Sequence, residues 1–305
     1  MKSFVMGIDF GSTTTKTVIL DLKGKLVASC VESQGSISAE GSRASMAGAL
    51  AQAGITQKDI ARAVSTGYGR RMIEVADQSY TEITCHARGA IAMFPEARLV
   101  IDIGGQDSKV ISVTGDGLVQ QFAMNDRCAA GTGKFLEALA RAVQVSVEEM
   151  GALAMTSTER LVVSNMCATF AETEVISLLA EGKSKPDVLG AVHAAIASRT
   201  AGLVARVGNR NPIVMTGGVA KNHAAVHYIE QELRAKMLIA PDPQIAGALG
   251  AALFALDEVA KPSAELIDEE DVVDEAMSTA SGCATQPCKT APKLPANERL
   301  LIGPM

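Results

Sequence analysis

Two cysteines of this chain, Cys128 and Cys167, each stand just ahead of a segment whose apolar residues recur at helical spacing. The steps of three and four residues predict two helices with one buried face each. A thiolate at a helix start is stabilised by the helix dipole and by unpaired backbone N–H groups, and so is an anionic metal–sulfur cluster. The apolar positions are Phe135, Leu136, Leu139, Ala142 and Val143 after the first cysteine, and Phe170, Val175, Leu178 and Leu179 after the second.

An iron–sulfur cubane takes four thiolate ligands, twice what this cysteine pair supplies. A two-fold symmetric dimer would bring four thiolates together, so the pair suggests a cluster shared between two chains. The alternative is that both residues belong to the core, since unpaired cysteine is often buried as a small hydrophobe.

Small and hydroxyl residues lie directly beside Cys128, and they are Gly131, Thr132 and Gly133. Together with Lys134 they form a flexible, donor-rich loop near a helix start, which is a common way to approach phosphate. The sequence therefore places a thiol next to a candidate anion-binding loop.

Residues 4–9 predict a short apolar strand that ends in Asp9, and a second strand follows from Thr17. The turn between them can cradle phosphates while Asp9 positions a hydrated Mg²⁺. The turn lacks the spacing GxxxxGK[ST] and leads into a strand, so it is not a P-loop. An ordinary polar hairpin remains the alternative for this segment alone. The candidate phosphate-binding residues are Gly11, Ser12, Thr13, Thr14 and Lys16.

The segment 99–113, LVIDIGGQDSKVISV, repeats this design. It contains an apolar strand, an aspartate, a glycine-rich turn, a lysine and a second strand, roughly 90 residues after the first copy. Two such loops facing each other would hold a polyphosphate from both sides. The residues of the second copy are Asp102, Gly104, Gly105, Gln106 and Lys109.

A third glycine signature, IVMTGGVAKN at 213–222, predicts a strand, a turn at Gly217 and Gly218, and a helix from about Ala220. A glycine pair at a strand-to-helix junction lets a flat ring or a phosphate approach the backbone closely. Downstream, residues 240–256 predict a loop and then a helix of very small residues. One face of that helix is nearly smooth, so we expect it to pack tightly on another element.

The order of these segments predicts an α/β chain with two related domains. We expect 1–98 to form the first, completed by the helix at 244–257, and 99–243 to form the second, which carries the cysteines. Between the two phosphate loops the pattern predicts helices over 40–54, 56–63 and 82–94, and a strand beginning at Val64. From Lys261 the chain turns acidic and then proline-rich, so 261–305 is expected to lie outside the core.

Charge and composition exclude several classes of function. With 28 basic and 34 acidic residues the net charge is −6, and there is no basic block of the kind that binds nucleic acid. The start of the chain lacks the long apolar stretch of a signal peptide, and no apolar run approaches the roughly 20 residues of a membrane span. We therefore expect a soluble, cytoplasmic protein. Its six cysteines are then thiols or metal ligands rather than disulfides.

Taken in order, the hairpin loop, its repeat and the strand-TGG-helix segment resemble the sugar kinase, heat-shock-protein-70 and actin ATPase superfamily. With the cysteine segments included, residues 4–257 resemble the activators (component A) of 2-hydroxyacyl-CoA dehydratases and the ATPase subunits of ATP-dependent benzoyl-CoA reductase. The motifs that carry this resemblance are GIDFGSTTTK, STGYGR, DIGGQDSK, NDRCAAGTGKFLE, CATFAETEVISLLAEG, MTGGVAKN and GALGAALFA.

The resemblance implies a duplicated actin-like fold of two ribonuclease-H-like domains with Mg-ATP in the cleft between them. It implies one [4Fe–4S] cluster per dimer, held by Cys128 and Cys167 of each chain, in a homodimer or a dimer with a related subunit. ATP hydrolysis to ADP would drive an electron to an iron–sulfur acyl-CoA dehydratase or reductase, with ferredoxin or flavodoxin as the donor. It places Asp9, Asp102 and Gln106 in catalysis, and the nucleoside at Gly217, Gly218, Lys221, Asn222 and Gln244.

Two features depart from the family pattern, Met166 where a hydroxyl residue is usual and the long segment after residue 260. A small-molecule kinase of the same superfamily is the alternative function, with Asp107 as a candidate base. A chaperone-like or filament-forming ATPase is a weaker alternative, because the chain leaves little room for a separate substrate-binding domain.

Overall fold

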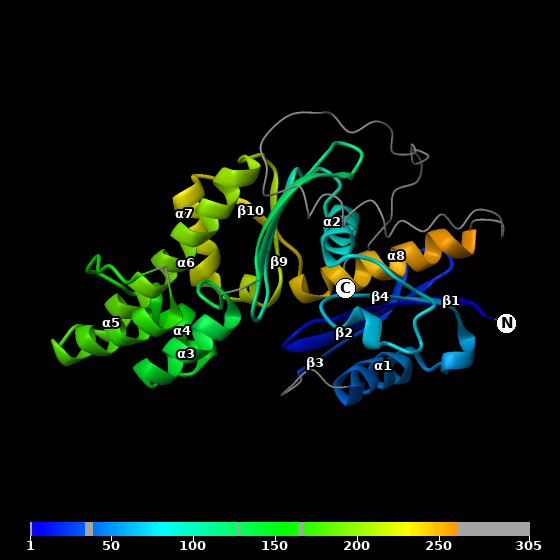
Figure 1. Cartoon of the computed structure of the whole chain (residues 1–305), viewed down its shortest axis with the longest axis horizontal. Helices are drawn as coiled ribbons and strands as arrows, with labels where there is room; N and C mark the ends of the chain where they lie inside the picture. The colour runs from blue at the N-terminus through cyan, green and yellow to red at the C-terminus, as the bar shows by residue number, and fades with distance from the viewer. Residues whose placement is uncertain (1, 34–38, 127, 165–166, 261–305) are drawn as a thin grey trace.

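Two five-stranded sheets with the same strand order form the frame of the molecule (Figure 1). The computed structural model describes residues 2–33, 39–126, 128–164 and 167–260. The first sheet has the order β3-β2-β1-β4-β5 and the second the order β8-β7-β6-β9-β10. In both sheets the hairpin strands pair antiparallel and the remaining neighbours pair parallel. This agreement confirms the internal repeat that the two glycine-rich turns predicted.

The elements of the first half are β1 (Phe4–Phe10), β2 (Thr14–Asp21), β3 (Leu26–Ser33), α1 (Ala39–Ala53), η1 (Gln57–Asp59), β4 (Ile60–Thr66), η2 (Arg70–Met72), β5 (Gln78–Ser79) and α2 (Glu82–Met93). The second half contains β6 (Leu99–Ile103), β7 (Ser108–Val113), β8 (Val119–Asn125), α3 (Gly133–Val143), α4 (Val147–Ala154), α5 (Ala168–Ala180), α6 (Lys185–Val207), β9 (Ile213–Thr216), η3 (Gly218–Lys221), α7 (His223–Leu233), β10 (Met237–Ile239), η4 (Pro243–Ile245) and α8 (Ala246–Ala260).

Helices cover the sheets in layers (Figure 1). Helix α1 packs on β2 and β3, whereas α8 packs on β1, β2 and β4. Helix α6 packs on β7 and β8 of the second sheet, and α3, α4 and α5 gather at the end of the molecule away from the first sheet. Helix α2 lies between the halves, because it contacts α8 on one side and strands of the second sheet on the other.

Glycines let α2 and α8 approach each other almost to backbone contact. A Cβ atom added to Gly250 would lie 1.9 Å from the carbonyl oxygen of Cys85, and one added to Gly89 would lie 1.9 Å from that of Ala246. The same is true of α8 and β1, since a Cβ at Gly7 would lie 2.0 Å from the oxygen of Ala248. The smooth helix that the small residues predicted is therefore wedged tightly between α2 and the first sheet.

We expect Gly250→Ala to destabilise the protein by at least about 3 kcal/mol, since backbone would have to move to admit the methyl group. Gly202→Ala is the matched control, because Gly202 lies in α6 and a Cβ there meets nothing within 4 Å. That control is expected to be neutral or to add up to about 1 kcal/mol from helix propensity. Urea unfolding of both variants measures the difference, and equal stabilities would show that this helix contact is not tight.

Three sequence predictions differ from the structure. The helix predicted over 56–63 is wrong, since only the short turn η1 is helical and Ile60 already begins β4. The helix predicted from about Ala220 begins at His223, after the 3₁₀ turn η3. The face predicted for α5 includes Phe170, but that side chain is 66% exposed and burial falls on Ala171 and Val175.

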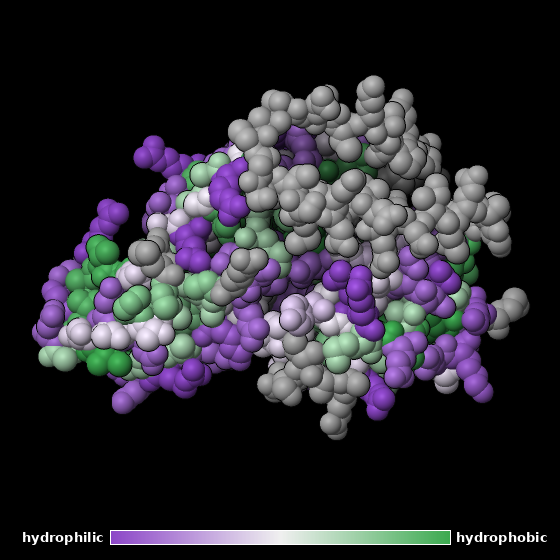
Figure 2. All heavy atoms as spheres, in the orientation of Figure 1, coloured by the Kyte–Doolittle hydropathy of each residue, from purple (hydrophilic) through white to green (hydrophobic). Residues whose placement is uncertain are grey.

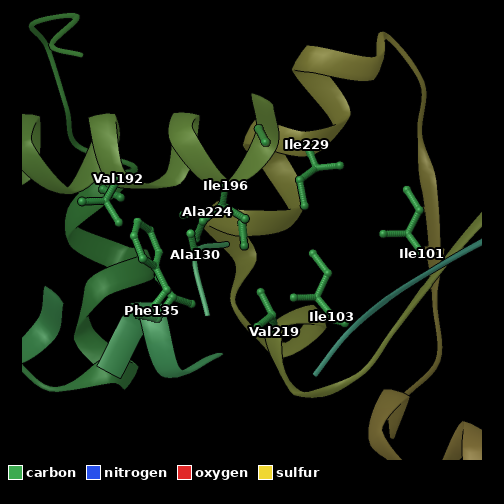
Figure 3. Packing of buried hydrophobic residues seen from close by; sticks show 14 of the residues in the cluster. Ile101, Ile103, Ala130, Phe135, Val192, Ile196, Val219, Ala224 and Ile229 are labelled. Carbon is green, nitrogen blue, oxygen red and sulfur yellow. The ribbon is translucent and has the colours of Figure 1, made fainter. Parts of the chain in front are cut away.

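Helix α6 is the longest and one of the most thoroughly buried helices of the second half. Among the residues that the structure describes, it alone has the length and mean hydropathy of a membrane-crossing helix. Two thirds of its apolar window, 67%, is buried inside the fold. Its residues Val192 and Ile196 lie in the core with Phe135 of α3 and Ala130 of the cysteine loop (Figure 3).

Candidate functional site

A cavity of about 760 Å³ lies between the two halves of the molecule. Its polar wall comes from the ends of the duplicated hairpins, and this wall contains both predicted aspartates and most of both predicted phosphate loops. The third glycine signature contributes the remaining predicted positions. The wall residues are Asp9, Gly11, Ser12, Thr13, Thr14 and Lys16 from the first loop, Asp102, Gly104 and Gly105 from the second, and Gly217, Gly218, Lys221, Asn222 and Gln244 around the third.

The two phosphate loops are equivalent in register. Asp9 on β1 lies opposite Lys16 on β2, and Asp102 on β6 lies opposite Lys109 on β7. The Lys16 Nζ is 3.2 Å from the Asp9 carboxylate, and the Lys109 Nζ is 3.5 Å from that of Asp102. In each sheet, one hairpin thus places a buried acid and an amine side by side at the end of its strands. This arrangement suits a hydrated divalent cation and a row of phosphate oxygens.

The two phosphate loops also contact each other at one point of the cavity wall. A Cβ atom at Gly105 would lie 2.2 Å from the Oγ1 atom of Thr13, so only a glycine leaves room for this contact. The Thr13 hydroxyl is buried and has no hydrogen-bond partner among the described residues. An orphaned hydroxyl at the meeting point of two glycine-rich loops fits a site that holds an oxygen-rich ligand.

Charges in the second loop balance one another. Burial alone would raise the pKa of Asp102, but the neighbouring His86 and Lys109 hold that pKa well below its usual range. Burial would likewise lower the pKa of Lys109, yet Asp102, Glu82 and Asp107 keep it above its ordinary value. Asp102 is therefore an anion and Lys109 a cation at neutral pH. The Asp107 carboxylate lies 2.8 Å from the Lys109 amine and forms an ion pair with it. A kinase would need this carboxylate as a free base.

Among the cavity residues that sequence reasoning missed, Glu82 and His86 are those that pair with charged residues of the second hairpin. Both lie on α2 one helical turn apart, so they present their side chains to the same side. Glu82 is 3.3 Å from the Lys109 amine, and burial raises the pKa of the Glu82 carboxyl although Lys109 lowers it in part. The signal was present as an acid and a histidine four residues apart in a predicted helix, but nothing in the sequence tied that helix to either loop.

The other end of the cavity comes from α3, α4 and η3, and it combines apolar side chains with the carboxylates of Glu137 and Glu148 at its margin. The Lys221 Nζ donates to the Gln244 side chain, which joins the third glycine loop to η4. Asn222 caps α7 by accepting the backbone N–H groups of Ala224 and Ala225, so part of its role is structural. A flat, mostly apolar group fits this end. The apolar residues are Leu136, Val147, Ala152, Met155 and Val219.

Some predicted site residues lie off the cavity. Gln106 is exposed and is not part of the wall. In the loop before α3, Gly133 reaches the wall, whereas Gly131 and Thr132 are buried behind it. The N–H groups at this helix start are already used, because those of Gly133 and Lys134 donate to the carbonyl oxygens of the second phosphate loop.

Both cysteines singled out in the sequence lie outside the cavity, are partly exposed and form no disulfide among the described residues. Cys167 is the N-cap of α5, and N–H groups of Thr169 and Phe170 lower the pKa of its thiol. The Cys128 sulfur accepts the N–H of Ala130 at 3.4 Å. Helices α3 and α5, which follow the two cysteines, pack against each other. Within the described residues no group of three metal-binding side chains forms in one chain. Met166, Cys283 and Cys288 lie outside the described residues.

We expect iodoacetamide to alkylate Cys167 in the iron-free protein well before Cys85. The reactive species is the thiolate, which the α5 start favours at Cys167, while burial raises the pKa of Cys85 to about 12. Peptide mass spectrometry after short exposure at neutral pH measures both rates, and labelling in urea gives the control in which they converge. Equal rates in the folded protein would contradict the environment described for Cys167.

The fold and the cavity together define a class of protein. Solved structures similar to this one include actin-like and sugar-kinase-like ATPases. A glucokinase of the ROK family from Streptomyces griseus, in complex with glucose and AMPPNP, has a TM-score of 0.53 at 14% identity, covering 83% of this chain and 99% of that one. The predicted α/β fold, a duplicated ATPase fold of the actin, heat-shock-protein-70 and sugar kinase type, is thereby confirmed.

Residues 6–255 match the BadF/BadG/BcrA/BcrD ATPase family, and this chain belongs to that family. The activator of lactoyl-CoA dehydratase from Anaerotignum propionicum is 43% identical, over 85% of this chain and 99% of the relative. The 2-hydroxyisocaproyl-CoA dehydratase activator of Clostridioides difficile is 41% identical, over 86% and 98%. A benzoyl-CoA reductase subunit from Thauera aromatica is 33% identical, over 81% and 91%.

Two solved structures of activators agree in fold over most of this chain. Component A of (R)-2-hydroxyglutaryl-CoA dehydratase from Acidaminococcus fermentans has a TM-score of 0.82 at 42% identity, covering 85% of this chain and all of that one, 100%. The 2-hydroxyisocaproyl-CoA dehydratase activator from Clostridium difficile, solved with bound ADPNP, has a TM-score of 0.81 at 40% identity, covering 87% and 99%. The resemblance to activators and reductase ATPase subunits is therefore confirmed.

Proposed function

We propose that this protein uses ATP hydrolysis to deliver low-potential electrons to an iron–sulfur acyl-CoA dehydratase or reductase. In this proposal a dimer holds one [4Fe–4S] cluster between its subunits, and each chain binds one Mg-ATP. The observation that carries the proposal is the direct backbone contact between the second phosphate loop and the helix that follows Cys128. The contact joins the nucleotide cavity to one of the two cysteines.

The cavity supports nucleotide binding from its chemistry. Lys16 and Lys109 supply positive charge for phosphate oxygens, and the carboxylates of Asp9 and Asp102 supply the oxygen ligands that a hydrated Mg²⁺ prefers. The apolar end accommodates a base, and the volume of about 760 Å³ suits a nucleotide. The relative from Clostridium difficile was solved with a nucleotide analogue, ADPNP.

The cysteines fit half of a cluster site. Cys128 and Cys167 are reduced, partly exposed and supplied with backbone N–H donors to their sulfur atoms. Such donors stabilise a thiolate and tune the potential of a bound cluster. When bound, the cluster would store and release single electrons. Cys128 and Cys167 would hold it through their sulfur atoms.

Hydrogen bonds connect the cavity to the helix that follows Cys128. The N–H groups of Gly133 and Lys134 donate to the carbonyl oxygens of Gly104 at 2.9 Å and Gly105 at 2.8 Å. A shift of the second phosphate loop therefore pulls directly on the start of α3, which follows the cysteine loop. Such a shift is what loss of the terminal phosphate produces in nucleotide-driven switches.

The cysteine loop is also braced from α6. The Asn125 side chain donates to the carbonyl oxygen of Cys128 at 2.8 Å, and Arg199 donates to Asn125 at 3.2 Å. Gly131 packs on the Arg199 side chain with positive φ, +83°, where a Cβ would approach within 3.0 Å. The loop thus has firm contacts on two sides, and motion at one side changes the surroundings of the thiol.

Electron delivery to a purified partner tests the proposal. The protein is reduced anaerobically, freed of excess reductant and mixed with the acyl-CoA dehydratase or reductase component of the same organism. Electron paramagnetic resonance then follows reduction of the partner with ATP, with ADP and with a non-hydrolysable analogue. Reduction that requires hydrolysable ATP supports the proposal. Equal reduction without nucleotide, or a colourless protein that phosphorylates sugars or small acids, would overturn it.

A further inference from the structure

One imidazole lies between the two buried carboxylates of the cavity. The His86 Nδ1 atom is 3.2 Å from the Oδ1 of Asp102, and its Nε2 atom is 4.0 Å from the Oδ2 of Asp9. Asp9 belongs to the first sheet and Asp102 to the second, whereas His86 comes from α2, which lies between the halves. A single side chain therefore spans the seam at the point where the two phosphate loops face each other.

Packing holds this ring in place. His86 is 6% exposed, and a Cβ added to Gly247 of α8 would lie 2.9 Å from its Nε2 atom and 2.9 Å from the Asp9 Oδ2. Glycine at that position leaves the space in which the imidazole and the carboxylate lie side by side.

The Nδ1 atom of His86 can still make a hydrogen bond. The Nδ1 atom is close enough to Asp102 for an ion pair, yet it is poorly aligned and makes no hydrogen bond among the described residues. Asp102 is meanwhile well supplied, since it accepts the Thr216 hydroxyl at 2.7 Å. A buried ring nitrogen that faces a carboxylate without a full hydrogen bond, on a residue that lines the cavity, has polar capacity available for a role in the site.

Two buried anions facing each other repel, and the repulsion is strong where water is scarce. Lys16 offsets the charge of Asp9, and Lys109 that of Asp102, but each amine belongs to the same hairpin as its acid. Lys109 also pairs with Glu82 of α2, but among the described residues neither lysine pairs with both acids. His86 is adjacent to both acids, so it is suited to hold them at one separation.

We propose that His86 is a positioning residue that sets the separation of Asp9 and Asp102 and so prepares a single cation site from two loops. This inference rests on the proposed Mg-nucleotide binding and deepens it. Without the imidazole the acids move apart, and the cation must supply the missing attraction. Residues that orient metal-holding groups in this way commonly contribute 10- to 100-fold, as a rough scale, to metal affinity.

The test compares His86→Ala, His86→Gln and wild type by calorimetric titration of Mg²⁺ into the ADP-loaded protein. ADP excludes turnover, so the readout is cation affinity rather than activity. We expect His86→Ala to weaken Mg²⁺ binding about tenfold while Mg-free ADP binds almost as before, and His86→Gln to recover part of the loss through its side-chain donor. Cys85→Ala is the matched control, because it removes a neighbouring buried side chain of α2 that lies off the cavity wall.

Unchanged Mg²⁺ affinity in both folded His86 variants would overturn the inference and leave the proposed function standing. An equal loss in Cys85→Ala would overturn it too, because the effect would then come from general loosening of α2. Wild-type protein that binds neither ADP nor Mg²⁺ would instead refute the proposed function, and the inference with it. Circular dichroism establishes that each variant is folded.

Discussion

Replacing Cys128 or Cys167 by alanine is expected to remove iron and sulfide from the anaerobically purified protein. A cubane shared by two chains carries about two irons per chain, and loss of one cysteine type removes two of its four ligands in the dimer. Thiolate ligation also stabilises folded metal sites strongly, so a half-ligated cluster does not persist. Iron and acid-labile sulfide assays, together with the visible spectrum, measure the loss.

The control for this experiment is Cys85→Ala, which removes a thiol of similar size from the interior. Cys85 is fully buried on α2 and burial raises its pKa, so it is no ligand candidate. That variant should keep its chromophore. The Cys128 and Cys167 variants should still bind nucleotide, since neither thiol lies on the cavity wall. Full iron and sulfide in either variant would refute the ligand assignment.

The second large effect is expected for Asp102→Asn, which should lower the rate of ATP hydrolysis by about a hundredfold. Asparagine keeps the shape and can still accept the Thr216 hydroxyl, but it removes the charge that faces Lys109 and His86. The variant then lacks the anion that would hold a hydrated cation beside the phosphates. Steady-state release of phosphate, measured against Mg²⁺ concentration, gives the size of the defect.

The pKa of Asp102 lies well below its usual range, so the wild-type carboxylate stays ionised throughout the range of about pH 5 to 9. The defect of Asp102→Asn should therefore be of similar size across that range. Asp116→Asn is the matched control, because Asp116 is an exposed acid in the turn between β7 and β8 of the same sheet. A full rate in Asp102→Asn would show that the hairpin acid has no part in hydrolysis.

The local design of the phosphate loops could be predicted from the sequence because it repeats. An aspartate, a glycine-rich turn and a lysine recur in one order, and this order predicts two similar hairpins. The structure adds the register, in which Asp9 lies opposite Lys16 and Asp102 lies opposite Lys109. The small residues of α8 likewise indicated a close helix contact before its partners were known.

Residues joined by the tertiary fold could not be predicted in the same way. His86 reaches both acids because α2 is held between α8 and the second sheet, and no local pattern encodes that position. The resemblance places Gln106, which follows the glycine pair, in catalysis, yet its side chain is exposed and is not part of the cavity wall.

Local patterns also misled where they were ambiguous. Ile60, Ala61 and Ala63 suit a helix as well as a strand, and parallel pairing of β4 with β1 decides for the strand. Phe170 fits the helical period of α5, but it is exposed at the end of the molecule where α3 and α5 lie and where hydrophobic side chains reach the surface (Figure 2). The period predicts which residues share a face, whereas burial depends on what covers that face.

The central claim is that each chain supplies half of a cluster site and that symmetry completes it. Sedimentation of the anaerobically purified, nucleotide-bound protein, with iron and sulfide measured on the same fractions, tests this most directly. We predict a dimer that carries about four irons and four sulfides, and dissociation to monomers when the cluster is removed by a chelator. Monomers that retain a full cluster, or a stable dimer that never contains iron, would contradict the account.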